Sequence, residues 1–463
     1  MKKYSNEQIE AINTKTQHTA VIAGAGSGKT TVLIERINRI LDSGANPDTI
    51  LAITFTRKAA GEMSERINRS DLTIKTFDAF CYDLVQQHLK KDIYIVNKTP
   101  FKESEVVLFN NYDVNLKSGE KPKLYDEYVA FKEEERKLDF NDIEHLALEV
   151  IKDLKITFDY ILIDEFQDTN LLQYTIFENL INSNTKTFIV GDPDQSIYGF
   201  RGADFKLLSR YIDQFSANTL VLTNNYRSLP AIILVANNLI SYNELRYKKD
   251  LNAFKEGNGV IYNSQFIDDV AEFNFVKNKY EELSETYESF AILYRNNYQG
   301  FLYRNHFKEL DVDNVLVTTI HQSKGLEFDV VFIVGVNKGI LPDEKMNMKE
   351  QEEEERRLFF VGVTRAKSEL YLTSSKKANY NGIEVPQESS KFLLETKKGN
   401  YPKKVIKKTI VSFNEGDTIV HNKFGEGLIV SSSPKFIEVD FSGDIKKISV
   451  KYPGIAKKWI LRV

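Results

Sequence analysis

This chain has few of the residues that make covalent or metal cross-links. Its 463 residues include one cysteine, one tryptophan, four methionines and six histidines. The single cysteine, Cys81, excludes an intrachain disulfide and a cysteine metal cluster, and it favours a reducing compartment, the cytoplasm. The neighbours of Cys81 are apolar, which favours a small core residue over a nucleophile.

Long apolar runs are also missing. No stretch approaches the roughly 20 residues that a membrane span needs, and the N-terminal residues 1–5 lead into no apolar signal core. We therefore expect no membrane partner. The hydrophobic share of 42% and the charged share of 28% are typical of a globular protein. This length is enough for about three domain-sized units.

The net charge of the chain does not decide whether it binds nucleic acid. The formal value is −4, and a local basic track can be concealed within such a total. Acidic residues gather at 133–135 and 352–355, whereas lysines crowd residues 397–408. This uneven distribution supports a local basic track of the kind that grips one strand.

The most informative motif of the chain is a glycine-rich stretch, residues 23–30. It follows the apolar run 19–22 and precedes a segment with apolar residues at helical spacing, 31–41. Strand, glycine loop and helix form the context of a phosphate-binding loop, where backbone N–H groups and a helix N-terminus surround phosphate oxygens. Lys29 supplies a mobile charge and Thr30 a hydroxyl for Mg²⁺. The sequence predicts a nucleotide site here, and its flanks disfavour a chance glycine turn.

A second aliphatic run, residues 159–163, ends in two carboxylates. Asp164 is predicted to hold Mg²⁺ through water, and Glu165 to orient and deprotonate the attacking water. An aliphatic strand that ends in such a pair is the usual partner of a phosphate-binding loop, which disfavours a merely solvated acidic turn.

A polar sensor follows the next predicted strand, residues 187–190. Gln195 stands a few positions before Tyr198, Phe200 and Arg201. One short loop would thereby join a γ-phosphate contact to a surface able to stack bases.

Strands alternate with helices in both halves of the chain, which predicts an α/β fold with parallel sheets flanked by helices. Only the first half has a phosphate loop, so we expect the nucleotide in a cleft between two α/β domains. Beyond residue 411 the period changes to two, which indicates a small β-barrel. The predicted divisions are 1–82 with 146–222 (first α/β domain), 83–145 (helical insertion), 223–396 (second α/β domain), 397–411 (basic linker) and 412–463 (barrel).

Taken in order, the motifs resemble those of the superfamily 1 DNA helicases of the UvrD/PcrA/Rep group. The matching segments are 6–8, 24–30, 54–60, 76–78, 164–170, 191–204, 225–228, 319–328 and 353–366, which together span nearly the whole chain. The resemblance implies two RecA-like P-loop domains that hydrolyse ATP with Mg²⁺. It also implies 3′→5′ helicase and translocase activity on single-stranded DNA and at junctions of single and double strands.

The resemblance implies roles for individual residues. Gln8 would read the adenine, Tyr226 would stack on it, and Glu327 would contact the ribose. Implied catalytic residues are Lys29, Glu165, Gln195, Arg227 and Arg365, of which the two arginines are fingers from the second domain. The implied nucleotide and metal contacts are Gln8, Gly24, Ala25, Gly26, Ser27, Gly28, Lys29, Thr30, Thr31, Asp164, Tyr226, Arg227, Glu327 and Arg365. The implied DNA track is Phe55, Thr56, Phe77, Tyr198, Phe200, Arg201 and His321.

The sequence departs from the family pattern at three places. Phe200 stands where the family commonly has tryptophan, which predicts a weaker grip on the strand. Asp78 replaces a histidine, which puts a phosphate contact in doubt. Between residues 296 and 317 the family inserts a large accessory domain, which this chain replaces with about 20 residues. We therefore expect movement along single strands and leave processive unwinding open.

The tail and two rival functions complete the expectations. Residues 416–427 are similar to the Tudor-like (SH3-like) module of UvrD/PcrA helicases, which meets RNA polymerase in relatives, so RNA polymerase or another protein is a candidate partner. The expected location is cytoplasmic, at the nucleoid. A nucleotide-regulated docking protein and an RNA helicase are the alternatives, since stacking and phosphate contacts tolerate either sugar.

Overall fold

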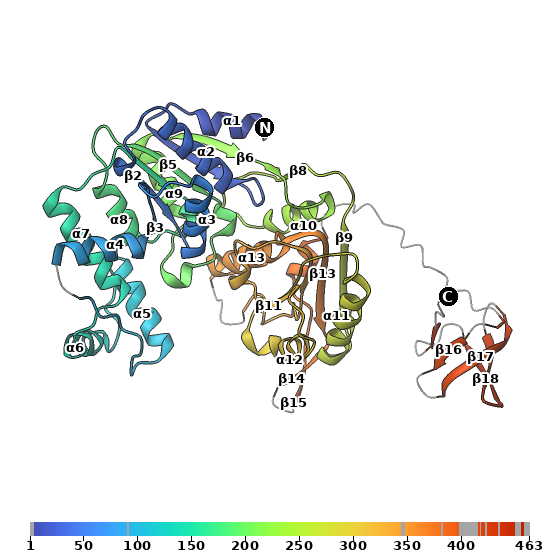
Figure 1. The fold of residues 1–463 in the computed structure, drawn as a ribbon. Coiled ribbons are helices and arrows are strands. Elements are labelled where there is room, and N and C mark those ends of the chain that lie inside the picture. Colours follow the sequence, from blue (N-terminus) through green and yellow to red (C-terminus); the bar gives the residue numbers. More distant parts are fainter. Residues whose placement is uncertain are drawn as a thin grey trace. The chain divides into compact units, whose positions relative to one another are not determined.

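The computed structural model describes residues 4–89, 92–343, 348–380, 383–397, 415–416, 418–421, 424–433, 436–449 and 455–457. The chain divides into two compact units, residues 1–401 and 402–463, which are described separately. The first unit contains two parallel sheets flanked by helices (Figure 1). The predicted α/β class is confirmed for this unit.

The first lobe is built on a six-stranded parallel sheet with the order β3-β2-β4-β5-β1-β6. Its strands are β1 (His18–Ala23), β2 (Ile50–Thr54), β3 (Thr73–Thr76), β4 (Tyr160–Ile163), β5 (Lys186–Gly191) and β6 (Asn218–Leu222). The flanking helices are α1 (Asn6–Asn13), α2 (Lys29–Asp42), α3 (Arg57–Ile67), α8 (Leu171–Asn179) and α9 (Lys206–Phe215). The short helices η1 (Pro47–Thr49), η2 (Phe166–Asp168), η3 (Pro193–Gln195) and η4 (Gly199–Arg201) connect them.

Both faces of this sheet are covered, which explains its continuous apolar strands. Alternate residues of β1 enter different cores: Ala20 and Ile22 pack on the side of α8 and α9, whereas Val21 and Ala23 pack on the side of α1, α2 and α3. Ser5 caps α1 in a reciprocal capping box with Gln8. The strand ends that carry the predicted site residues therefore lie at one edge of a rigid sheet.

A helical segment extends from the first lobe. It consists of α4 (Phe77–Leu89), α5 (Glu103–Val114), α6 (Tyr125–Glu135) and α7 (Phe140–Leu154), and Figure 1 shows α5 and α6 projecting away from the sheet. Its own small core is aromatic and contains Phe109, Tyr125 and Tyr128. The helices expected between residues 83 and 145 are present, although both limits fall inside the longer helices α4 and α7.

The second lobe has a five-stranded parallel sheet with the order β11-β10-β12-β13-β9. Its strands are β9 (Val260–Phe266), β10 (Phe290–Tyr294), β11 (Val315–Thr319), β12 (Phe328–Ile333) and β13 (Ala366–Ser375). The remaining elements are α10 (Pro230–Ile240), α11 (Asp269–Leu283), α12 (Phe301–Glu309), α13 (Lys349–Val363), α14 (Phe392–Glu395), η5 (Asn297–Gly300), η6 (His321–Ser323), the pair β7 (Asn224–Asn225) and β8 (Asn252–Ala253), and the hairpin β14 (Lys377–Tyr380) and β15 (Ile383–Pro386).

The connection between β10 and β11 is short. It contains only η5 and α12, whereas the family pattern has a large accessory domain at this place. The structure therefore confirms the short connection that the sequence predicts between these two strands.

The second unit is an antiparallel sheet with the order β19-β18-β17-β16-β20. Its strands are β16 (Thr418–His421), β17 (Gly425–Ser432), β18 (Phe436–Phe441), β19 (Asp444–Ser449) and β20 (Ile455–Lys457), around a small core of Ile429, Ile437, Val439 and Ile448. The strands are confirmed, and closure into a barrel stays a prediction. The predicted linker, apart from Lys397, lies outside the described residues. Within the described ranges no helix is long and apolar enough to span a membrane.

Candidate nucleotide and nucleic-acid sites

The predicted phosphate-binding loop joins β1 to α2. Gly26 and Gly28 have positive φ values of 66° and 82°, a region that glycine adopts readily. A Cβ at Gly26 would lie 2.5 Å from Asn225 Nδ2, and one at Gly28 would lie 2.9 Å from Gln8 Nε2. Backbone conformation and close neighbours therefore both require glycine at these two positions.

Two carboxylates at the end of β4 face this loop. The Nζ of Lys29 is 2.9 Å and 3.0 Å from the two carboxylate oxygens of Glu165, and Thr30 Oγ1 donates to Asp164 Oδ2 across 3.1 Å. Glu165 has a φ of 53°, an uncommon left-handed conformation for a residue with a side chain. The four side chains that the sequence assigned to phosphate, metal and water are thus brought together.

The two carboxylates have opposite pKa shifts. Burial, together with the adjacent charge of Glu165, raises the pKa of Asp164 to about 6. Burial also opposes ionisation of Glu165, but the charges of Lys29 and Lys324 outweigh it and lower the pKa of Glu165 to about 2. Oxygen ligands such as Asp164 and Thr30 suit Mg²⁺, and Glu165 is ionised at neutral pH.

The first residues of the second lobe lie against the loop. Asn225 Nδ2 donates to the carbonyl of Ala25 at 2.7 Å, and the backbone N–H of Tyr226 donates to the carbonyl of Gly26 at 2.9 Å. The ring of Tyr226 is 4.8 Å from that of Phe254, which is 66% exposed. An exposed ring beside a predicted stacking residue suits a flat ligand, and sequence reasoning missed Phe254.

Gln8 and Thr31 flank the loop. The amide of Gln8 is engaged within the protein, since Nε2 donates to the carbonyl of Ser27 and Oε1 accepts from the N–H of Ser5, both at 3.0 Å. Thr31, on α2, accepts a hydrogen bond from Arg66 at 3.2 Å. Gln8 is placed beside the loop as predicted, with both polar atoms of its amide occupied.

Two arginines of the second lobe carry predicted catalytic roles. Arg227 Nε donates to Glu327 at 2.7 Å, and its Nη1 donates to the carbonyl of Thr364 at 3.0 Å. Arg365 is 2% exposed and donates from Nη2 to Gln195 Oε1 at 3.2 Å. Burial, and then the charge of Arg227, lowers the pKa of Arg365 to about 9, so its guanidinium remains charged at neutral pH. Arg365 is therefore a buried cation in contact with the predicted phosphate sensor.

Buried ion pairs that sequence reasoning missed also hold the sensor loop. Gln195 Nε2 donates to Asp192 at 2.5 Å, and Lys249 lies 2.7 Å from Asp192 and 2.8 Å from Asp194. Arg246 pairs with Asp194 at 2.7 Å. The signal was indirect: two aspartates in a buried loop need cations, and the sequence does not say which residues supply them.

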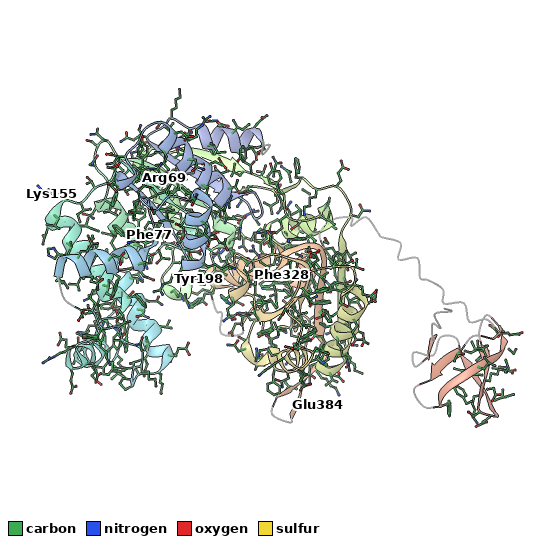
Figure 2. All side chains as sticks on the ribbon, in the orientation of Figure 1. Arg69, Phe77, Lys155, Tyr198, Phe328 and Glu384 are labelled. Atoms are coloured by element: carbon green, nitrogen blue, oxygen red, sulfur yellow. The ribbon has the colours of Figure 1, made fainter. Side chains whose placement is uncertain are left out.

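The predicted strand-binding rings form a continuous row. Phe55 and Tyr198 are stacked with centroids 4.9 Å apart, Phe200 follows Tyr198 at 6.1 Å, and His321 meets Phe200 edge-on at 5.7 Å. The guanidinium of Arg201 lies 5.4 Å from the ring centres of both Tyr198 and Phe200. Figure 2 labels Tyr198 where the first lobe faces the second. The row therefore combines rings from both lobes with the cation of Arg201.

His321 enters this row as a neutral ring. Burial, followed by the nearby charges of Arg295, Arg201 and Lys324, lowers the pKa of His321 to about 3. Its imidazole is thus uncharged at neutral pH, so it offers a stacking surface rather than a cation for phosphate.

A cavity of about 610 Å³ lies beside the rings, between the strand ends and the helical segment, and its lining includes Thr56, Phe77 and Asp78. Thr56 caps α3 through Ala59, and Phe77 is only 8% exposed because it packs into the core. Asp78 shares a hydrogen bond with Glu144, and burial raises the pKa of both carboxyls. Thr56 and Phe77 are predicted DNA contacts; Thr56 is exposed, whereas Phe77 offers little free surface.

The chain is similar to known helicase domains over most of its length. It matches the UvrD/REP helicase N-terminal domain over residues 4–121 and 98–216, and the UvrD-like helicase C-terminal domain over residues 220–317 and 304–377. A probable DNA helicase of Mycoplasma pneumoniae is 28% identical over 88% of this chain and 90% of its own length. The ATP-dependent DNA helicases PcrA of Staphylococcus aureus and Staphylococcus epidermidis are each 32% identical over 68% of this chain. These matches span about half of the PcrA proteins, 50% and 51%.

Proposed function

Since this chain belongs to the UvrD-like helicase family, we propose that it is an ATP-dependent DNA helicase that moves along single-stranded DNA. The proposed direction is 3′→5′, and ATP is hydrolysed in the cleft between the two lobes. The observation that carries this proposal is one loop: Gln195 contacts Arg365 across the lobes, and three residues later Tyr198 lies in the row of rings between Phe55 and Phe200. A change in the contacts of Gln195 with the phosphates would therefore be transmitted to the bound strand through a loop of a few residues.

The first lobe would bind the phosphates. Lys29 would leave Glu165 and contact the β- and γ-phosphates, and the N-terminus of α2 would add positive potential. Thr30 and Asp164 would hold Mg²⁺, which neutralises phosphate charge when it is bound. Glu165, freed from Lys29, would accept the proton of the attacking water.

The second lobe would complete the site. Arg365 and Arg227 would stabilise the charge that develops on the transferred phosphoryl group, while Gln195 senses the γ-phosphate. Tyr226 would stack on the adenine that Gln8 reads, and Glu327 would contact the ribose. Release of the cleaved γ-phosphate would then loosen the lobes, because it removes the negative charge that attracts the two arginines.

The strand would lie along the rings. Phe55, Tyr198, Phe200 and His321 would stack on bases, and Arg201 would add a cation between them. Alternate opening and closing of the lobes would shift the strand by bringing rings of the second lobe towards and away from rings of the first. The division of the chain into two RecA-like domains, a helical insertion and a Tudor-like barrel belongs to the same proposal. A protein partner such as RNA polymerase, and a place at the nucleoid, are also proposed.

ATP hydrolysis with and without nucleic acid tests the proposal. Single-stranded DNA is expected to stimulate turnover more than RNA of the same sequence, and Lys29→Ala is expected to abolish turnover. Strand displacement from partial duplexes with a 3′ or a 5′ tail then reports direction. Stronger stimulation by RNA would favour the RNA helicase alternative, and absence of stimulation by either would favour a docking protein. Displacement only from the 5′-tailed duplex would overturn the direction.

A further inference from the structure

A glutamine next to the predicted catalytic base has no role in the proposed function. Gln167 is fully buried in η2. Its Nε2 donates to Glu165 Oε2 at 2.6 Å and to Asp168 Oδ2 at 3.0 Å, while its Oε1 accepts from the N–H of Asp192 at 2.8 Å. Both ends of this amide are therefore fixed, and one end holds the carboxylate of Glu165.

Asp168 also forms an ion pair with Lys324 of the second lobe. The Nζ of Lys324, which follows η6, pairs with Asp168 Oδ2 and donates to the carbonyl of Gln195 at 2.8 Å. It also lies 5.0 Å from the ring centre of Tyr198 and 5.9 Å from that of Phe55. Lys324 is thus in contact with the stacked rings and with the acidic residues at once.

Asp168 is bonded on one side only. Lys324 and Gln167 both donate to its Oδ2, whereas its buried Oδ1 has no hydrogen-bond partner among the described residues. A buried carboxylate oxygen without a partner costs free energy, so the carboxylate would gain by turning that oxygen towards a donor. A displacement of Lys324 would therefore be passed to Gln167 through a single shared atom.

A base bound between Phe55 and Tyr198 would supply that displacement. The rings of Phe55 and Tyr198 are 4.9 Å apart, and a base stacked between them needs roughly 7 Å, twice the contact distance of about 3.5 Å. Insertion of a base must separate the rings, and Lys324 lies against both of them. Separation of the rings would therefore remove contacts that hold Lys324 in its present position.

We propose that Gln167 is a positioning residue that couples strand binding to ATP hydrolysis. A base that enters between Phe55 and Tyr198 moves Lys324, Asp168 follows, and Gln167 then turns Glu165 towards the attacking water. This inference rests on the proposed function, since it takes Glu165 as the base and the rings as the strand site. The inference adds the route by which strand binding would control the rate of ATP hydrolysis.

Gln167→Leu tests this route in the full chain. We expect kcat in the presence of oligo(dT) to fall about 10²-fold, the size of effect that a misplaced catalytic group gives. The KM for ATP and the dissociation constant for oligo(dT), measured by fluorescence anisotropy, are expected to stay the same. Gln214→Leu is the matched control. Gln214 hydrogen-bonds to Tyr174 and Glu178 on α8 and not to the relay, by which we mean Lys324, Asp168, Gln167 and Glu165. A purely structural role would instead lower the melting temperature, the oligo affinity and kcat together.

Lys324→Met tests the other end of the relay and decides the case if Gln167→Leu folds poorly. It is expected to reduce stimulation by the strand, and adding Gln167→Leu to it should cause no further loss, because residues of one relay are not additive. Lys338→Met, at an exposed ion pair with Glu388, is its control. Wild-type-like stimulation in the variants, or additive losses, would overturn this inference alone. Absence of stimulation in the wild type would overturn the proposed function and the inference together.

Discussion

Arg365 of the second lobe donates to the side-chain amide of Gln195 in the first lobe across 3.2 Å. Gln195 in turn donates to Asp192, whose other oxygen accepts from Lys249 of the second lobe. The sensor loop is therefore held on two sides by cations from the opposite lobe. This arrangement makes Arg365 the first residue to test.

Arg365→Ala is expected to reduce kcat for ATP hydrolysis by about 10³–10⁵, the contribution of an arginine that stabilises phosphoryl transfer. Arg365→Lys should restore little, because one ammonium cannot replace the several donors with which Arg365 also contacts Val361 and Leu326. Single-turnover hydrolysis is the measurement. Arg69→Ala, at an exposed ion pair with Asp71 that Figure 2 locates on the first lobe, should be close to wild type. A comparable loss in Arg69→Ala would refute a specific role for Arg365.

Glu165→Gln and Lys29→Ala are expected to separate hydrolysis from binding. Glu165→Gln removes the proton acceptor and keeps the shape of the side chain, so hydrolysis is lost while a fluorescent ATP analogue still binds. Lys29→Ala removes the cation that would meet the phosphates, so both binding and hydrolysis are lost. Equilibrium titration and turnover assays distinguish the two variants. Hydrolysis in Glu165→Gln at the wild-type rate would exclude Glu165 as the base.

Phe200→Ala is expected to weaken binding of single-stranded DNA by about 1–3 kcal/mol, the value of one stacked base. Phe200 is 45% exposed in the row of rings, so its loss removes a contact without opening the core. Fluorescence anisotropy with a labelled oligonucleotide measures this. Phe301→Ala, which truncates a ring that is 61% exposed on α12, is the control. Equal losses in the two variants would mean that Phe200 has no special place in the track.

Glu272→Gln is expected to change how stability depends on pH. Burial raises the pKa of Glu272 from its ordinary 4.5 to about 7, so between these values the folded chain keeps a proton that the unfolded chain releases. The free energy of unfolding therefore falls as pH rises through this window, and the neutral variant avoids that loss. Thermal unfolding at about pH 5 and pH 8 should show Glu272→Gln more stabilised at the higher pH. Glu281→Gln, on the exposed face of α11, should leave the dependence unchanged; a parallel change there would contradict the assignment.

The sequence predicted the site best where functional residues are adjacent in the chain. Gly26, Lys29 and Thr30 lie within one loop, and the carboxylates Asp164 and Glu165 directly follow a strand, so composition and spacing predicted both. The assignment to UvrD-like helicases, the parallel sheets and the short crossing after β10 are confirmed for the same reason: each depends on local patterns or on ordered motifs.

Pairs that form across the fold could not be predicted in this way. Lys324 meets Asp168 and Lys249 meets Asp192 only because the two lobes pack together. No spacing rule connects residues so far apart in the chain. Asp78 is a similar case, since the sequence raised a doubt about its phosphate contact but could not show that it shares a hydrogen bond with Glu144.

The contacts of Asn225 and Tyr226 with the phosphate-binding loop have a mechanical consequence for the proposed motor. They attach the loop to the lobe that must move, so closure of the lobes and nucleotide affinity are linked, and such a linkage acts equally in both directions. A pulling force on the strand that draws the second lobe away would weaken ATP binding by the same free energy that ATP contributes to closure. Under load the motor would therefore release ATP more readily, and the force at which it stalls would rise with the concentration of ATP.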